Sequence, residues 1–177
     1  MNWFKSVFSR KAPKPDAQEK DPELEKAYAI GRSSAEEMST DLESFISRRF
    51  VGLKDRYIGV FQDGLNSAKS STDCSPIISA RIDFTLFHKN IELLKGNMIG
   101  EIEEYMGEWI KFSALMEMES EVRKLIEQSV KNITEDIFFS GVGVFTEKAD
   151  ELKDADDAWR RANPKLAAQL PLHDKEY

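Results

Sequence analysis

Apolar and small residues recur at steps of three and four along residues 22–67, the spacing of one face of a long α-helix. Asp21-Pro22-Glu23 fits the start of this helix, because Asp can cap free backbone N–H groups and Pro has no N–H to leave unpaired. Each glycine in the stretch either admits a close neighbouring helix or marks a bend. The pattern predicts one coiled-coil-like helix from Pro22 to about residue 67, with the stripe Leu24, Tyr28, Gly31, Ala35, Met38, Leu42, Ile46, Phe50, Leu53, Tyr57 and Val60.

A second helix is predicted to begin at Ser75-Pro76, after a loop of small polar residues at 66–75. Its apolar face is too broad for a two-helix seam, so the helix should contact at least two neighbours. Gly96 either ends or kinks it. The main stripe is Ile77, Ala80, Phe84, Phe87, Ile91, Leu94, Met98, Ile102, Tyr105, Trp109, Phe112 and Met116, and the flanking set is Ile78, Ile82, Leu86, Leu93, Ile99, Met106 and Ile110.

A third apolar stripe, beginning at Val122, follows a break that we expect around residues 113–120. Residues 137–145 are uncharged and rich in β-branched and aromatic side chains, so they fit a buried strand or a helix. We favour helix, because no partner strand is visible elsewhere in the sequence. Helical periodicity resumes over residues 146–153.

These elements predict an all-α fold: an elongated antiparallel bundle of three long helices, or four if Gly96 ends the second. We expect four parts, namely a basic amphipathic segment at 1–11, a proline-containing linker at 12–21, the helical bundle at 22–153 and a loose tail at 154–177. The tail is interrupted by two prolines and either docks into a partner or packs back on the bundle.

The N-terminal segment combines bulky apolar residues with cations. A helix would group Trp3, Phe4, Val7 and Phe8 on one face and leave Lys5, Arg10 and Lys11 to the rest. Such a segment suits an anionic membrane surface, where rings enter the acyl boundary and cations meet the headgroups. Docking to a partner protein and packing on the chain's own bundle remain alternative interpretations.

The net charge of -7 is unevenly distributed. Residues 1–15 hold four basic residues and no acidic one, which leaves 21 basic and 32 acidic residues in the remainder. Because a strongly acidic body repels phosphate, the basic cluster Arg48, Arg49, Lys54 and Arg56 is more readily explained by pairing with the third helix than by nucleic-acid binding.

Acidic residues are concentrated at 101–121, where Glu101, Glu104 and Glu108 have the spacing of one helix face. This face is a solvated surface or an acidic docking surface. A metal-dependent all-α phosphohydrolase is the alternative, in which Glu101 and Glu104 would hold a divalent cation together with Glu147 and Asp150.

The remaining candidates for chemistry are few. The single cysteine excludes an intramolecular disulfide, and it fits a reducing compartment. Neither His88 nor His173 belongs to the Glu-x-x-His element of a di-iron centre. We therefore expect no cofactor and no resident metal, and the sequence favours a non-enzymatic protein.

The predicted function is that of a cytoplasmic helical interaction or regulatory protein, which residues 2–11 could attach to the cytoplasmic face of a membrane. A protein partner is expected, self-association is compatible with the pattern, and nucleic acid is disfavoured. A small-ligand-sensing bundle with a pocket around Tyr105 and Trp109 is a further alternative.

Overall fold

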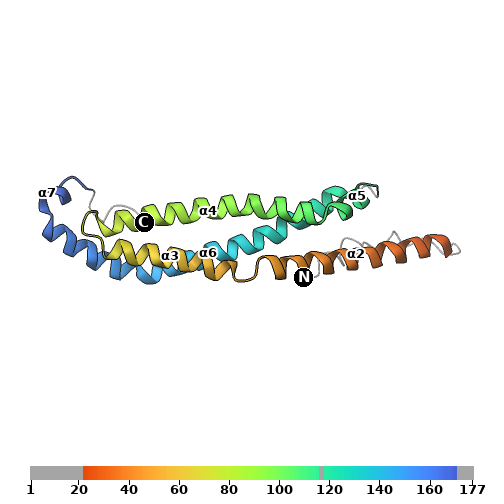
Figure 1. The fold of residues 1–177 in the computed structure, drawn as a ribbon, viewed down its shortest axis with the longest axis horizontal. Helices are drawn as coiled ribbons and strands as arrows, with labels where there is room; N and C mark the ends of the chain where they lie inside the picture. The colour runs from red at the N-terminus through yellow and green to blue at the C-terminus, as the bar shows by residue number, and fades with distance from the viewer. Residues whose placement is uncertain (1–21, 116–117, 171–177) are drawn as a thin grey trace, which may run out of the picture. The chain divides into compact units, whose positions relative to one another are not determined.

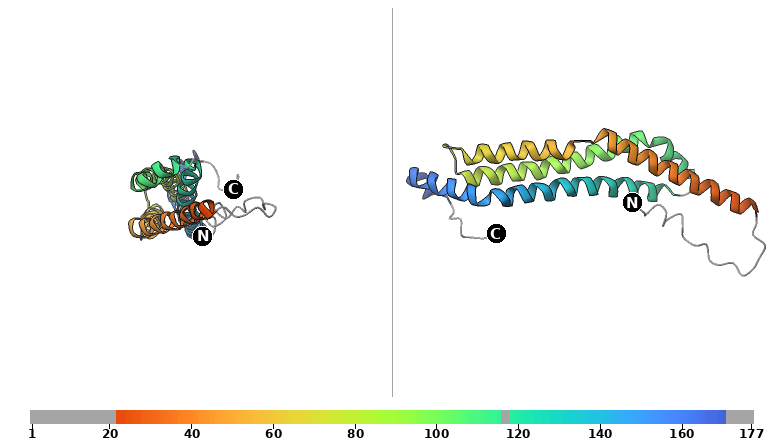
Figure 2. Two further views of the ribbon diagram at one scale, coloured as in Figure 1. Left: turned by 90° about the vertical axis from the view of Figure 1, so that its right-hand side faces the viewer. Right: turned by 90° about the horizontal axis from the view of Figure 1, so that it is seen from below.

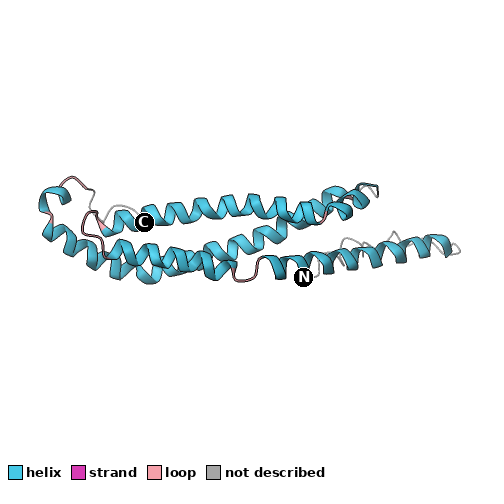
Figure 3. Cartoon of the chain, in the orientation of Figure 1, coloured by secondary structure: helices cyan, strands magenta, loops and turns pink. Residues whose placement is uncertain are grey.

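The computed structural model describes residues 22–115 and 118–170, and every regular element in these ranges is a helix (Figures 1 and 3). The all-α class is therefore confirmed. The helices are α2 (Pro22–Arg49), α3 (Leu53–Lys69), α4 (Pro76–Tyr105), α5 (Gly107–Leu115), α6 (Glu119–Ala162) and α7 (Pro164–Ala167). None of the described helices combines the length and the apolar composition needed to cross a membrane.

The packing contacts divide the chain into two units. The first comprises the described residues up to Val51 together with Ile102–Glu119, and the second comprises Gly52–Glu101 and the described residues from Ser120 onward. In the first unit α2 packs on α5 and the residues before it. Met38, Leu42, Met106 and Ile110 are buried there.

The single helix predicted for residues 22–67 is wrong, because the chain leaves helical geometry between α2 and α3. Gly52 has φ 70°, a left-handed conformation that glycine adopts without the steric cost of a Cβ. The amide of Phe50 still donates to the carbonyl of Ile46, and the amide of Arg56 donates to that of Gly52. α2 therefore ends at Arg49, and Gly52 is the N-cap residue of α3.

The start predicted for the second helix is confirmed. Pro76 is the first residue of α4, and the Ser75 hydroxyl accepts a hydrogen bond from the amide of Ile78 at 3.4 Å. Gly96 lies inside α4 and does not end it. The helix is interrupted instead at Met106, between α4 and α5, although the Met106 amide still donates to the carbonyl of Ile102 at 2.8 Å. A second break follows α5, within the predicted range of 113–120.

α6 includes residues 137–145, so the helical interpretation of this apolar stretch is confirmed. The helix also continues to Ala162, nine residues beyond the point at which the sequence indicated a loose tail. Asp156 and Trp159, both beyond that point, are buried. Residues 154–162 are thus part of a packed helix and not of a loose tail, which agrees with the alternative that this part packs back on the bundle.

Within the second unit, α4 contacts both α3 and α6, as its broad apolar face predicted (Figure 2). Phe87 of α4 stacks on Phe61 of α3 with ring centroids 4.5 Å apart. Phe84 of α4 faces Phe145 of α6 at 5.2 Å. α6 also pairs with α3, through Lys54 and Asp136 at 3.0 Å.

Candidate functional site

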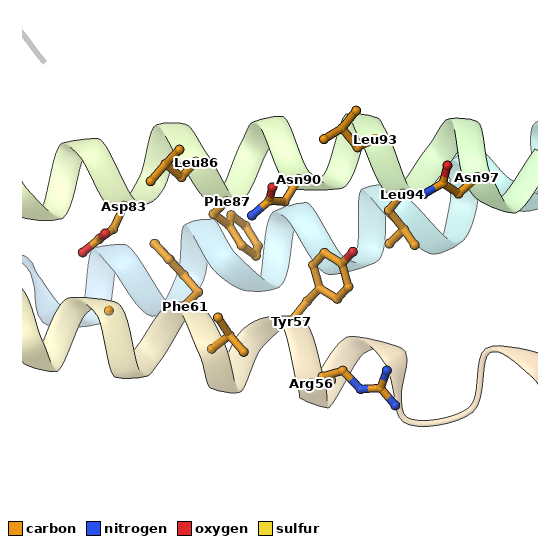
Figure 4. A pocket seen from close by; sticks show the side chains of 12 residues that line it. Arg56, Tyr57, Phe61, Asp83, Leu86, Phe87, Asn90, Leu93, Leu94 and Asn97 are labelled. Atoms are coloured by element: carbon orange, nitrogen blue, oxygen red, sulfur yellow. The ribbon is translucent and has the colours of Figure 1, made fainter.

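A groove of about 580 Å³ lies between α3 and α4 (Figure 4). The two helices run in opposite directions, since Gly64 of α3 approaches Asp83 of α4 and the earlier residue Phe61 stacks on the later residue Phe87. The floor is apolar: Phe61, Phe87 and Leu94 line the groove and are buried.

The rim of the groove is also apolar, but it is open to solvent. Val60 is 69% exposed, Leu86 51% and Leu93 60%. Isolated exposed leucines are ordinary on protein surfaces, whereas several along one groove mark a surface that binds something. The groove therefore presents a continuous apolar strip that no described residue covers.

The groove-facing side of α4 has the residue spacing of a coiled-coil seam. Asp83, Asn90 and Asn97 are seven residues apart, and Leu86 and Leu93 lie between them at steps of three and four. In coiled coils leucine commonly fills one of the two seam positions of the heptad, and a polar residue at the other position can specify the register at a cost in stability. This side of α4 therefore has the residue spacing that packing against a further helix would use.

A charge lies at each end of the groove: Asp83 near Gly64, and Arg56 toward Leu94 (Figure 4). A Cβ added to Gly64 would lie 3.3 Å from the Asp83 carboxyl carbon, so glycine lets α3 approach this side chain closely. Burial raises the pKa of Asp83 above its usual value. Neither Asp83 nor Arg56 forms an ion pair with another described residue.

The side chains that line the groove supply apolar surface, two amides, one carboxylate, one guanidinium and the phenol of Tyr57. Apolar side chains provide affinity, and the few polar groups fix orientation. The lining is suited to recognition of a helix. Leu86 and Leu93 belong to the flanking set predicted for the second helix, but the periodicity did not indicate that they remain exposed.

The predicted acidic face lies around the turn at Met106. Glu101 and Glu104 belong to α4, whereas Glu108 lies in the first turn of α5 and pairs with Lys111 at 2.6 Å. Glu104 is exposed, and Glu101 is partly buried with a partner of its own. The three carboxylates therefore do not share one uninterrupted helix.

The metal-site alternative is not supported by the packing of the second unit. Gly141 of α6 lies against Phe87, and α4 and α6 are antiparallel, so Glu147 lies near residue 81 of α4. That position is about 30 Å from Glu101 at ~1.5 Å per residue. Across residues 22–115 and 118–170, no three His, Cys, Asp or Glu side chains gather closely enough to hold a metal ion.

The residues of the ligand-pocket alternative are engaged within the first unit. Tyr105 stacks on Phe45 with ring centroids 4.2 Å apart, and the indole N–H of Trp109 donates to Asp41 at 3.1 Å. The groove between α3 and α4 includes neither residue.

The N-terminal segment lies outside the described residues: Trp3, Phe4, Lys5, Val7, Phe8, Arg10 and Lys11. In the basic cluster, Lys54 pairs with Asp136 of α6, as expected for the third helix. The guanidinium of Arg48 donates to the carbonyl of Ser44 within α2.

A buried polar cluster joins the start of α4 to the end of α6, and the sequence did not indicate it. Asp156 is fully buried, accepts a hydrogen bond from the Ser75 hydroxyl and pairs with Arg160 at 2.6 Å. Nearby, the indole N–H of Trp159 donates to the carbonyl of Thr72 at 2.9 Å. The cluster is fully occupied in holding helices together, which leaves the groove as the candidate site.

Comparison with models of known protein families, with curated protein sequences and with solved structures finds no match to this chain. Functional inference therefore starts from the groove and its chemistry.

Proposed function

We propose that this protein is a non-enzymatic helical interaction protein whose groove between α3 and α4 receives an amphipathic helix. The observation that carries the proposal is the solvent-exposed apolar rim formed by Val60, Leu86 and Leu93. In this proposal the long helices form an elongated antiparallel bundle that acts in the cytoplasm and holds the groove in a fixed shape.

The energetics favour covering this rim. Complete burial of a Val or Leu side chain contributes roughly 1.5–3 kcal/mol, and the three rim residues are each more than half exposed. Part of this energy is available to a ligand that covers all three, after the cost of association is met.

A helix fits the groove better than an extended peptide does. An extended peptide gains much of its affinity from backbone hydrogen bonds to a sheet edge, and helix surfaces offer none. Side chains at steps of three and four on an incoming helix can pack between those of α4, which have the same spacing.

A photo-crosslinking amino acid in place of Leu93 tests the proposal in cells. We expect adducts whose peptides carry apolar residues at steps of three and four. Glu92 is the matched control, because it is the exposed neighbour of Leu93 on α4 and does not line the groove. Adduct yields at Leu93 no higher than at Glu92 would contradict the proposal.

The proposal retains residues 2–11 as an attachment to an anionic membrane surface, on the strength of their aromatic and basic side chains. Deletion of residues 1–11 should abolish sedimentation with anionic liposomes. Replacement of Lys5, Arg10 and Lys11 by Gln, with the aromatic residues kept, should weaken it and remove its salt dependence. Undiminished binding after the deletion would exclude this attachment.

The exposed acidic residues around the turn at Met106 are retained as a second docking surface for a basic partner segment. This docking surface is proposed because carboxylates outnumber cations in residues 101–121.

A further inference from the structure

Two opposite charges lie on opposite walls of the groove, at different levels along it. Gly64 of α3 lies beside Asp83 of α4, and Phe61 lies one turn further along, beside Phe87. Arg56 precedes Gly64 by eight residues in α3. At ~1.5 Å per residue, about 12 Å of groove therefore separates the level of Arg56 from the level of Asp83.

The rim between these two levels is apolar. Val60 of α3 and Leu86 of α4 lie there, and both are more than half exposed. Leu93 and then Asn97 extend the groove beyond Arg56 (Figure 4). A helix that covers the apolar rim therefore passes over the carboxylate of Asp83 and the guanidinium of Arg56.

Covering the groove removes water from both charged groups. A charge that loses water without gaining a partner is costly, and an opposite charge in good geometry offsets that cost. Among the described residues, neither Asp83 nor Arg56 has an ion-pair partner. Burial already raises the pKa of Asp83 before anything covers it. The occupant must therefore bring an opposite charge to each of these two groups.

We infer that the groove selects, from a partner protein, an amphipathic helix with one basic and one acidic residue about two turns apart beside its apolar stripe. The basic residue meets Asp83, and the acidic residue meets Arg56. This inference rests on the proposed function and names the chemistry of the partner. Residues about seven apart return to the same side of a helix. The two pairs also fix the direction of the helix, since the reverse direction sets like charges together.

The chain's own N-terminal segment lacks this combination of charges. Residues 1–15 hold four basic residues and no acidic one. They could supply a cation to Asp83, but they would bring no anion to Arg56. Charge complementarity therefore favours a partner protein over residues 1–11 as the occupant of the groove.

Three synthetic helical peptides test the charge pair on the full chain by fluorescence anisotropy. All carry leucines at steps of three and four, and they differ only at two positions seven residues apart. These positions hold one Lys and one Glu in the mixed peptide, two Glu in the acidic peptide and two Lys in the basic peptide. At physiological ionic strength we expect the mixed peptide to bind about tenfold or more tighter than either other peptide. Binding of all three within about threefold of one another would overturn the inference.

Two variants change which peptide should bind best. Arg56→Glu leaves two carboxylates in the groove, so the basic peptide should bind about tenfold tighter than the mixed one. Asp83→Asn nearly conserves the side-chain volume and leaves the guanidinium as the one charge lining the groove, so the mixed peptide should lose its advantage over the acidic one. Circular dichroism verifies that both variants fold. A preference for the mixed peptide that survives in Arg56→Glu would overturn the assigned contact.

Lys165→Glu is the matched control for the change in net charge. Lys165 is exposed on α7 and does not line the groove, and its reversal alters the net charge as much as Arg56→Glu does. We expect this variant to keep the wild-type preference for the mixed peptide. A shift toward the basic peptide in both variants would indicate general attraction to an acidic protein and would overturn the inference.

Photo-crosslinking at Leu93 separates this inference from the proposed function. Adducts above the Glu92 level support both when their peptides carry a base and an acid about two turns apart. Adducts that lack this pair, or that come from the chain's own sequence, overturn the inference and leave helix recognition intact. The same holds if none of the three peptides binds at up to about 100 µM while Leu93 still forms adducts. Leu93 adducts no more abundant than those at Glu92 overturn the proposed function, and the inference with it.

Discussion

Gly141 and Gly143 both lie in the apolar stretch of α6, and each precedes a valine, but their packing differs. Gly141 is buried, and a Cβ at this position would overlap the ring of Phe87. Gly143 is exposed, and a Cβ there would meet nothing within 4 Å. Gly141 is therefore needed for close approach of α6 to α4, whereas Gly143 only weakens its helix.

We predict that Gly141→Ala lowers the free energy of unfolding by about 1–3 kcal/mol, because the added methyl group overpacks the contact with Phe87. Gly143→Ala should raise it by up to about 1 kcal/mol, since alanine is the better helix former and meets no obstruction. Urea titration followed by circular dichroism measures both. Equal effects from the two substitutions would show that α6 does not pack on Phe87 through Gly141.

Glu151 lies on the surface between two lysines. Lys69 of α3 contacts it at 2.9 Å and Lys148 of α6 at 3.2 Å. Hydrogen bonds from Lys69 and then Lys148 lower the pKa of this carboxyl below its usual value of 4.5. The pair with Lys69 joins two helices that are distant in the sequence.

We predict that Lys69→Met raises the pKa of Glu151 toward its ordinary value, as measured by carbon-detected NMR titration. Because the folded pKa is lowered, the stabilising contribution of Glu151 is present above pH 4.5 and is lost as pH falls through the folded value. The stability difference between wild type and Lys69→Met should therefore shrink below pH 4.5. A Glu151 pKa unchanged in the variant would mean that the ion pair is not populated in solution.

At the scale of the element, α4 is capped at its first turn by a residue from another helix. The Asp156 carboxylate lies at the start of α4, where it accepts from the Ser75 hydroxyl and from the amide of Ile77 at 3.5 Å. A negative charge at this end of a helix also interacts favourably with the helix dipole. The end of α6 thus stabilises the start of α4.

We predict that Asp156→Asn lowers the free energy of unfolding by about 2–4 kcal/mol, because it removes the buried negative charge that pairs with Arg160 and weakens the cap. Asp154→Asn on the same helix is the control and should change it by less than about 0.5 kcal/mol, since Asp154 is exposed. Thermal and urea unfolding compare the two. Equal small effects would argue against a buried pair.

Glycine also shows why helix ends are hard to place from sequence. Gly52 and Gly96 both lie within regular apolar stripes, yet only Gly52 has a positive φ and separates two helices. The steric freedom of glycine permits either conformation. Whether a glycine adopts the helical or the left-handed conformation depends on the packing of the flanking helices. The apolar periodicity does not show which conformation occurs.

At the scale of the whole molecule, the two units have separate sets of stabilising contacts. α2 is held in its unit by the Trp109–Asp41 hydrogen bond and by stacking of Phe45 on Tyr105. The second unit has the aromatic contacts of Phe87 and the buried Asp156 cluster. Opening of α2 should therefore not require loss of the contacts in the second unit.

We predict that Asp41→Ala accelerates amide hydrogen exchange in α2 and leaves the exchange of residues 122–159 in α6 unchanged. Glu43→Ala is the matched control, because Glu43 is exposed on the same helix. Exchange followed by mass spectrometry locates the effect. Equal acceleration in α2 and α6 would show that the two units open together.

The sequence by itself determined the all-α class, the start of α4 at Pro76 and the broad apolar face with which α4 meets two helices. These depend on local rules, namely the helical period and the cap with proline at the first position. Only part of the candidate site could be predicted. The sequence places Leu86 and Leu93 on an apolar face of the second helix, but it does not show that they remain exposed.

The tertiary structure alone decided the register, and with it the groove. A hairpin centred on residue 71, in the middle of the loop predicted at 66–75, would place Phe61 opposite residue 81, whereas Phe61 stacks on Phe87. Periodicity shows which side of each helix is apolar but not how far the helices slide past one another. That offset depends on side-chain volumes and close approaches such as Gly64 on Asp83. It decides which apolar residues are buried as core and which remain open as a binding surface.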